Sequence, residues 1–360
     1  MNEQMKMFIE CHVPIKACNF KCEYCYVTQN GWWKSETPDF SYCLESIDKA
    51  FAKERLGGTC MINLCATGET LLYPEMVEVI HKLLLCGHYV MVVTNGTLTQ
   101  RFEEIAKFPS ELKEHLFFKF SFHYLELLKL KMLDKYFKNV HFVQDNGMSF
   151  TVEITPDDGY IPYIPEIKKV CMENLGSLCH VTVSRDERKK EFPLLSNLPM
   201  DEFINTWKDF DSGLFDFKSK IFGVKRKEFC YAGKWSIVLE LGTGEYSQCY
   251  HGNKIGNFYK NTNKPPKLYP VGKNCRQGHC FNGHAFLGFG LIPGLDTMDY
   301  ADMRNRKPEN GKPWLRDEME AFMRKRLIDT NQEDTSFQKW CHNIKSKDII
   351  RRAVRKVIKH

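Results

Sequence analysis

Short apolar runs alternate with helical stretches over the first two hundred residues, and this alternation constrains the fold more than any other feature. Several of the runs are apolar throughout, as strands buried on both faces should be. The predicted strands are residues 7–14, 60–65, 89–93, 117–122, 150–154 and 179–183. The predicted helices are residues 42–55, 74–86, 100–108, 125–137, 165–175 and 201–210. Alternating β and α units of this kind predict an α/β fold with a mostly parallel sheet.

Three cysteines, Cys18, Cys22 and Cys25, lie on a short loop directly after the first predicted strand. Thiolates are ligands of iron–sulfur clusters and of zinc. A structural zinc site needs a fourth ligand, but the next cysteine is Cys43 and the next histidine is His81. Three thiolates on a four-iron cluster leave one iron open for a substrate or cofactor. The alternatives are three reduced structural thiols or half of a zinc knuckle.

Polar residues follow several of the predicted strands, at the end where parallel barrels gather their chemistry. A buried carboxylate such as Glu69 can accept a charge-assisted hydrogen bond from an ammonium group, or it can cap the next helix. Asn95 precedes a glycine and also fits an ordinary turn. Ser121 fits a small core position equally well, and a lone histidine such as His123 is more often structural than catalytic. These strand-end residues are Gly68, Glu69, Thr94, Asn95, Ser121, His123 and Glu153.

A segment rich in glycine, asparagine, aromatic residues and cysteine begins near Cys230. Residues 235–241 and 245–249 predict a β-hairpin around a glycine turn. Because antiparallel strands bring their outer ends together, Cys230 and Cys249 should lie near one another. Four thiolates can saturate one 4Fe–4S cluster or one zinc ion. The four candidate ligands are Cys230, Cys249, Cys275 and Cys280, with His279 or Cys341 as possible substitutes for either of the last two.

Composition limits the remaining possibilities. The apolar content of 43% and the charged content of 27% are those of a soluble globular protein. The N-terminus lacks a secretory signal and no apolar run is long enough to span a membrane, so we expect a cytoplasmic protein with reduced thiols. The cysteines expected in the core are Cys11, Cys43, Cys60, Cys65, Cys86, Cys171 and Cys179. A net charge of +6 without a nucleic-acid motif predicts no nucleic-acid partner.

The C-terminal region predicts helices at residues 314–328 and 347–360. The second has an apolar face and a basic face. Such a helix could contact an acidic membrane surface, but a helix docked on the protein with a solvated basic face is the preferred interpretation.

The cysteine loop, read as Cys18-x3-Cys22-x-Tyr24-Cys25, resembles the signature of the radical S-adenosylmethionine (radical SAM) enzymes. The resemblance implies a partial (β/α)6 barrel over residues 1–212. It also implies a 4Fe–4S cluster on the three cysteines whose open iron binds SAM. In that family an electron from the cluster cleaves SAM to a deoxyadenosyl radical, which abstracts a hydrogen atom from the substrate.

The same resemblance implies roles for the strand ends. Gly68 and Glu69 are similar to the segment that receives the amino group of SAM, although Thr67 stands where the family commonly has another glycine. Tyr24 is expected to pack against the adenine ring, with the backbone of Tyr26 near its edge. By resemblance the residues that line the ribose and carboxylate of SAM are Thr94, Asn95 and Ser121.

Cys230, Gly244 and Cys249 have the spacing that opens the SPASM/twitch extension of radical SAM enzymes. A full SPASM domain carries more cysteines than this segment offers, so the resemblance implies the shorter twitch form with a second, auxiliary 4Fe–4S cluster. It places the twitch-like domain at residues 213–300 and a helical extension at residues 301–360. The similarity extends over roughly residues 7–285.

These features predict a radical SAM oxidoreductase or maturase, with catalytic residues undefined. Dehydrogenation of a small sugar or cyclitol alcohol is preferred, because the barrel pattern begins within the first ten residues and leaves no leader-binding domain before it. Modification of a ribosomal peptide is the alternative within this class. A flavodoxin- or ferredoxin-type protein is the expected electron donor. The alternative outside enzymes is a zinc-stabilised binding module.

Overall fold

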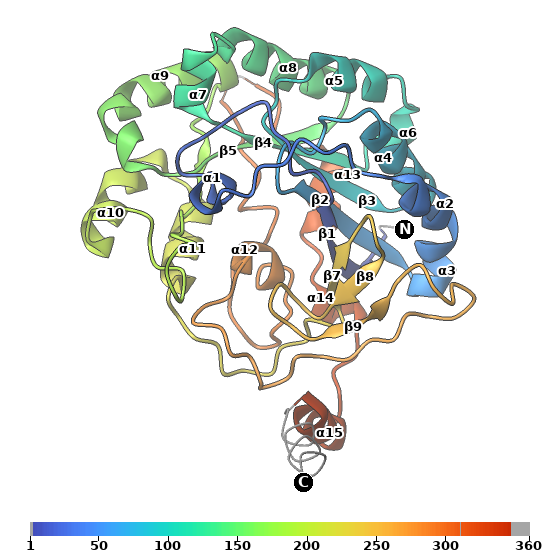
Figure 1. Cartoon of the computed structure of the whole chain (residues 1–360). Helices are drawn as coiled ribbons and strands as arrows, with labels where there is room; N and C mark the ends of the chain where they lie inside the picture. Colours follow the sequence, from blue (N-terminus) through green and yellow to red (C-terminus); the bar gives the residue numbers. More distant parts are fainter. Residues whose placement is uncertain (1–2, 310, 347–360) are drawn as a thin grey trace.

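The computed structural model describes residues 3–309 and 311–346. Within these residues, nine strands form one sheet in the order β6-β5-β4-β3-β2-β1-β7-β8-β9 (Figure 1). Strands β1 to β7 pair with one another in parallel, whereas the β7–β8 and β8–β9 pairs are antiparallel. The strands are β1 Met5–Val13, β2 Thr59–Ala66, β3 Tyr89–Thr94, β4 Leu116–Ser121, β5 Ser149–Ile154, β6 His180–Val181, β7 Ser236–Glu240, β8 Glu245–Ser247 and β9 Lys254–Asn257. The predicted α/β class with a mostly parallel sheet is confirmed.

Helices connect the parallel strands, as the alternating sequence pattern predicts. They are α1 Tyr26–Asn30, α2 Ser41–Ala50, α3 Lys53–Leu56, α4 Glu75–Leu85, α5 Thr99–Ala106, α6 Ser110–Lys113, α7 Tyr124–Lys129, α8 Leu133–Asp145, α9 Ile164–Leu175, α10 Met200–Trp207, α11 Gly213–Ile221, α12 Gly283–Phe286, α13 Asp317–Met323, α14 Leu327–Thr330 and α15 Ser336–Ser346. In three places the structure has two shorter helices where the sequence predicted one. These are residues 42–55, 125–137 and 314–328.

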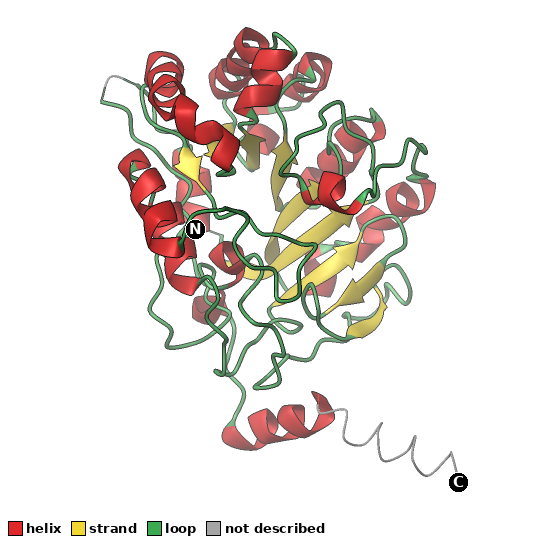
Figure 2. Cartoon of the chain, turned by 60° about the vertical axis from the view of Figure 1, so that its left-hand side comes forward, coloured by secondary structure: helices red, strands yellow, loops and turns green. Residues whose placement is uncertain are grey.

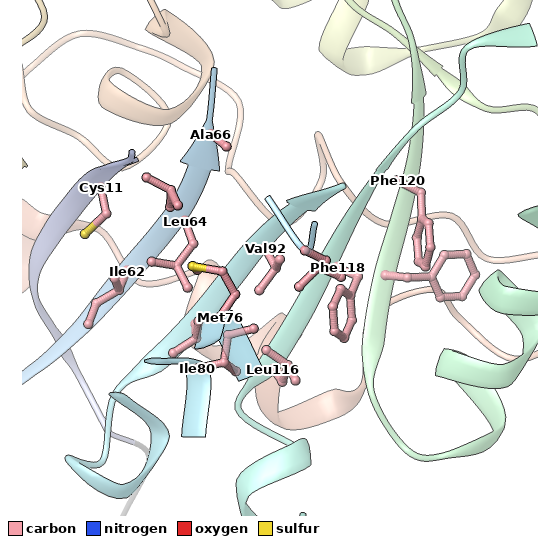
Figure 3. Packing of buried hydrophobic residues seen from close by; sticks show 14 of the residues in the cluster. Cys11, Ile62, Leu64, Ala66, Met76, Ile80, Val92, Leu116, Phe118 and Phe120 are labelled. Atoms are coloured by element: carbon pink, nitrogen blue, oxygen red, sulfur yellow. The ribbon is translucent and has the colours of Figure 1, made fainter. Parts of the chain in front are cut away.

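The two faces of the sheet differ in chemistry because side chains alternate along each strand. On the outer face, apolar residues of β2 to β4 pack against the connecting helices in one large core. Figure 3 shows part of this packing, with Ile62, Leu64 and Val92 on the sheet beside Met76 and Ile80 of α4. Every second residue of each strand is therefore buried in the core on the outer face, and the residues between them face the inner side of the sheet.

The inner face is apolar near the start of the strands and polar further along them. Its apolar part packs against the C-terminal region. Phe8 of β1 lies with its ring centroid 5.2 Å from that of Phe289, and Tyr89 of β3 stacks on Phe322 of α13 at 3.6 Å. The chain after residue 283 thus covers the inner face near the start of the strands, and polar side chains occupy the inner face further along them.

The hairpin of β7 and β8 lies where residues 235–249 predict it, and the sheet adds β9 to it. Strand β7 pairs in parallel with β1, matching Phe8 to Ser236 and His12 to Glu240. The cysteine-rich segment therefore joins the same sheet as the first six strands. The division into residues 1–212, 213–300 and 301–360 stays a prediction.

Figures 1 and 2 show α15 apart from the other helices, at the end of the described chain. The predicted basic helix at residues 347–360 lies outside the described residues. None of the helices in the described ranges combines the length and the apolarity needed to cross a bilayer.

Candidate functional site

The cysteine loop leads from β1 to α1 and gathers three thiols at the C-terminal end of the strand. Burial raises the pKa of Cys18 to about 11, and nearby Glu69 and Cys25 add to that increase. Burial also raises the pKa of Cys22, with further contributions from the Cys25 and Cys18 thiols. The three sulfurs are therefore close enough to influence each other's charge. Ligation by metal would be needed to hold them as thiolates at neutral pH.

Two N–H groups point at the sulfur of Cys18. The Phe20 backbone N–H donates to Sγ at 3.4 Å, and the Asn95 side-chain amide lies 3.8 Å from it. The same amide donates to the side-chain oxygen Oδ1 of Asn19 at 2.7 Å. The side-chain Nδ2 of Asn19 in turn donates to Thr97 Oγ1 at 2.9 Å. Hydrogen bonds to sulfur tune iron–sulfur clusters, so this network fits a thiolate ligand at Cys18. Neither Asn19 nor Thr97 was predicted, although Asn19 lies within the cysteine loop itself.

Gly68 holds the second strand end against the cysteine loop. Its N–H donates to the Ile15 carbonyl at 2.8 Å, and the N–H of Glu69 donates to the Ala17 carbonyl at 3.0 Å. A Cβ on Gly68 would lie 1.9 Å from the Ala17 carbonyl oxygen, so only glycine allows this contact. Of the two positions where the family commonly has glycine, Gly68 is therefore the one at which a side chain would clash with the cysteine loop. Thr67, at the position that departs from the family pattern, hydrogen-bonds instead with Tyr26.

Glu69 is 2% exposed and is fixed by three donors. Its carboxylate accepts hydrogen bonds from Thr94 Oγ1 at 2.7 Å, from the Asn95 N–H at 2.7 Å and from the Leu71 N–H at 3.0 Å. Burial raises the pKa of Glu69 and these bonds oppose the increase. Helix α4 begins at Glu75 with Pro74 as its N-cap, so Glu69 does not cap it. The alternative of a helix cap is wrong.

Tyr24 and His123 form a buried aromatic pair beside the loop. The Tyr24 hydroxyl hydrogen-bonds with Nδ1 of His123 and accepts a bond from the Tyr160 hydroxyl at 3.2 Å. Burial lowers the pKa of His123 to about 4, which keeps the ring neutral near pH 7. These contacts favour the structural interpretation of His123. Ser121 lies at the end of β4, opposite Glu153 in the register with β5.

The four cysteines of the second group also lie within mutual reach. Burial raises the pKa of Cys280, and the thiols of Cys230, Cys249 and Cys275 contribute after it. Burial raises the pKa of Cys249 to about 11, again with Cys275 nearby. Cys230 and Cys249 are likewise near enough for one thiol to influence the charge of the other, and their role as ligands of one centre stays a prediction. His279 packs instead between aromatic rings, with centroids 4.8 Å from those of Phe222 and Phe281.

Neither thiol group has the compact geometry of a single-ion site. Within the described residues, no three side chains of His, Cys, Asp or Glu converge as the ligands of one metal ion do. A zinc ion with Zn–S bonds of about 2.3 Å holds its thiolates within about 4 Å of one another. A 4Fe–4S cluster binds one thiolate on each iron and spreads its ligands over the corners of a larger body. The ligand sets of both cysteine groups stay predictions.

The polar part of the inner face forms a cavity that the sequence did not reveal. Glu153 is bound there by Lys119 Nζ at 3.0 Å and by Arg304 Nη1 at 2.5 Å. Burial would raise the pKa of Glu153, but Lys119 and Arg304 lower it well below its usual range. Cys65, predicted in the core, lines this cavity instead, because it lies on the inner face of β2. Arg304 lies 151 residues from Glu153 in the chain, so no local pattern connects them.

Together these features define a class: a mostly parallel α/β protein with three neighbouring thiols at the C-terminal end of its first strand. A family model described as the radical SAM superfamily matches residues 13–158, which include the cysteine loop, Glu69 and Asn95. Over these residues the chain is similar to the radical SAM superfamily. Members of this superfamily are enzymes.

Several known proteins are similar to parts of this chain. Neomycin C epimerase from Streptomyces fradiae is 33% identical over 85 residues, which are 24% of this chain and 26% of that protein. Native anSMEcpe with bound AdoMet has 18% identity and a TM-score of 0.51, over 71% of this chain and 79% of that chain. SuiB from Streptococcus suis has 14% identity and a TM-score of 0.48, over 72% of this chain and 64% of that chain. The chain thus spans about a quarter of the epimerase's length. The anSMEcpe similarity supports the fold.

Proposed function

We propose that this protein uses a 4Fe–4S cluster on Cys18, Cys22 and Cys25 to cleave SAM reductively. One observation carries the proposal: the three-thiol loop is bonded, through Ala17 and Asn19, to the strand ends that hold Glu69 and Asn95. Three thiolates leave one cluster iron open. Once bound there, SAM supplies a carbon radical that removes a hydrogen atom from a substrate on the inner face.

The neighbouring residues are suited to hold SAM. The fixed carboxylate of Glu69 can accept a charge-assisted hydrogen bond from an ammonium group. Its three protein donors leave further lone pairs free, since a carboxylate has about four. Tyr24 and Tyr26 border the loop on the side where the adenine is expected. Thr94, Asn95 and Ser121 lie at adjoining strand ends and complete the proposed SAM residues.

The proposed reaction is dehydrogenation of a small sugar or cyclitol alcohol. After loss of a hydrogen atom, oxidation of an alcohol to a carbonyl releases one proton and one electron. Cys230, Cys249, Cys275 and Cys280 are proposed to hold the auxiliary 4Fe–4S cluster that takes the electron. The 33% identical stretch shared with an epimerase named for a small molecule supports such a substrate. We expect a cytoplasmic enzyme reduced by a flavodoxin- or ferredoxin-type protein.

The test is anaerobic reconstitution with iron and sulfide, followed by SAM and dithionite, with 5′-deoxyadenosine as the product measured. The parent should form 5′-deoxyadenosine, and Cys22→Ala should form none. Cys86→Ala, which changes a half-buried cysteine outside both groups, is the matched control and should behave like the parent. Equal yields from the parent and Cys22→Ala would refute the proposal.

A further inference from the structure

Three cations surround one carboxylate on the inner face of the sheet, and the proposed SAM chemistry gives them no role. Lys119 and Arg304 bind Glu153 directly, at 3.0 Å and 2.5 Å. Lys218 of α11 is near enough for Glu153 to influence its charge, and its ammonium group hydrogen-bonds with Thr182. We call Lys119, Lys218 and Arg304 the lumen cations, where the lumen is the polar space on the inner face of the sheet. They come from β4, α11 and the segment before α13, so the fold itself assembles them.

The charges of this group do not cancel. Glu10 is the other carboxylate nearby, and it is 1% exposed. It accepts hydrogen bonds from the amides of Asn63 at 2.7 Å and Asn282 at 2.9 Å, and burial raises its pKa. Arg185, also close, is paired with Glu187 at 2.8 Å. While Lys218 is protonated, three cations therefore face one ionised carboxylate, or two if Glu10 is ionised, and positive charge remains in either case.

Arg304 shows where this surplus is open to a ligand. Its side chain is 0% exposed, and its guanidinium carbon lies 4.9 Å from the ring centroid of Tyr300, which interacts with it. Apart from Tyr300, no described group accepts a hydrogen bond from Nε or Nη2. A buried cationic donor without a partner is costly. Arg304 and Lys119 both line the inner cavity, together with Tyr250 and His284. An anion in that cavity would satisfy the free donors of Arg304 and neutralise the excess charge.

We propose that the lumen cations form a binding site for an anionic oxygen group of the substrate. The group is either a carboxylate or a tetrahedral oxyanion such as a phosphate or sulfate ester. Planar guanidinium groups recognise both kinds with paired hydrogen bonds. This inference rests on the proposed function, because it places the anion on the molecule that the enzyme oxidises. It narrows the expected substrate from any sugar or cyclitol alcohol to an acidic one.

Lys218 gives the site a pH dependence. Burial lowers the pKa of Lys218 to about 7; Glu153 opposes this, and Lys119, Arg185 and Arg304 lower it further. His279 and His284 also face this region, and burial lowers their pKa values, so both are neutral between pH 6 and pH 8. Glu10 is the one further carboxylate near this group, and burial raises its pKa. Anion binding should therefore weaken as the pH rises from 6 to 8.

The experiment titrates the reconstituted full-length enzyme, without SAM or reductant, by calorimetry. The probes are sodium sulfate and sodium acetate at pH 6 and pH 8, with chloride holding the ionic strength constant. Neither probe changes its charge over this range. The variants are Lys218→Met, Lys218→Arg and Arg304→Lys, and Lys220→Met on the exposed side of the same helix is the control.

We expect the parent to bind sulfate or acetate more tightly at pH 6 than at pH 8. Lys218→Met should weaken binding at pH 6 roughly tenfold or more, since one positive charge near the anion is lost. Lys218→Arg should bind equally at both pH values, because arginine stays protonated. Arg304→Lys keeps the charge but not the paired donors and should also weaken binding, whereas Lys220→Met should not.

Two outcomes would overturn the anion site: no binding of either probe beyond that of chloride, or equal affinities of Lys218→Met and Lys220→Met. Preference for sulfate would indicate a phosphate or sulfate ester, and preference for acetate would indicate a carboxylate. The assay contains no SAM, and SAM cleavage is measured separately on the same preparation. Loss of the anion site therefore leaves the proposed SAM chemistry standing, and the reverse also holds.

Discussion

Gly68 is the residue at which backbone packing and the cofactor site depend on one another. Alanine there would place its Cβ 1.9 Å from the Ala17 carbonyl oxygen, so the cysteine loop would have to move. We expect Gly68→Ala to cost about 1–3 kcal/mol of stability and to lower the iron bound after reconstitution. Gly256→Ala is the control, because its Cβ would meet Tyr246 at an ordinary 3.5 Å. Equal iron content and melting temperature in the two variants would contradict the steric argument.

Glu69 is the residue on which the proposed SAM affinity depends most directly. Glu69→Gln keeps the shape of the side chain but replaces an acceptor oxygen with an NH2 group, which faces the donors of Thr94 or Asn95. We expect the affinity for SAM to fall roughly tenfold to hundredfold, because a charge-assisted hydrogen bond is lost. Equilibrium binding of SAM to the reconstituted protein measures this. Glu78→Gln, on the exposed side of α4, should bind as the parent does.

At the level of elements, the sequence predicted the strands better than the helices. Parallel strands buried on the outer face need apolar runs, and such runs are visible locally. The helix over residues 125–137 was wrong because Lys131 adopts a φ of +54°, which ends α7 and lets α8 run on to Asp145. A left-handed lysine of this kind has no signal in the local helix propensity.

The candidate site divides in the same way. The cysteines, Glu69 and Asn95 could be predicted because a motif and the strand ends place them. The hydrogen bonds that Asn95 forms with Asn19 and Thr97 could not be predicted, because they depend on how two loops meet. Glu153 was placed correctly at a strand end, but its partner Arg304 comes from a distant segment. Lys119 gave no signal, since a lysine inside an apolar strand also fits an exposed position.

The ion cluster that joins β4, β5 and the segment near residue 304 gives a stability prediction. Glu153→Gln leaves Lys119 and Arg304 without their counterion, which should cost about 3–5 kcal/mol at pH 7. The pKa of Glu153 is lowered in the folded protein, so its contribution is complete above its ordinary value of 4.5 and declines as the pH falls below it. The difference between parent and variant should narrow by about 1.4 kcal/mol for each pH unit below 4.5.

Urea unfolding of the cluster-free, reduced chain at pH 7, pH 5 and pH 4 measures this difference. The values at pH 7 and pH 5 should agree, and the value at pH 4 should be smaller. Glu245→Gln removes an exposed pair with Lys254 and should change stability by less than about 1 kcal/mol. A Glu153→Gln variant as stable as the parent at pH 7 would show that the lumen cations need no internal counterion.

Across the whole molecule, one sheet relates the two cysteine groups. Strand β1 leads into the loop with Cys18, and β7, its parallel neighbour, leads through the hairpin to Cys249. The hairpin then reverses the chain, so β8 runs back toward the start of β7 before the chain reaches Cys249. The inner cavity lies on the face of the sheet that the chain after residue 283 covers. In the proposed function, the two cysteine groups would serve as two redox centres built on one sheet.

Counting metal tests this arrangement in a single measurement. Two 4Fe–4S clusters predict about eight irons per chain after anaerobic reconstitution. Cys18→Ser combined with Cys22→Ser should leave about four irons and abolish SAM cleavage, because the second group of cysteines is untouched. Cys230→Ser combined with Cys280→Ser should also leave about four irons but retain SAM cleavage, because the loop after β1 does not depend on these thiols. If the second pair of substitutions removed one zinc ion and no iron, the group near the hairpin would be a structural zinc site, and the electron released during oxidation would need a different acceptor.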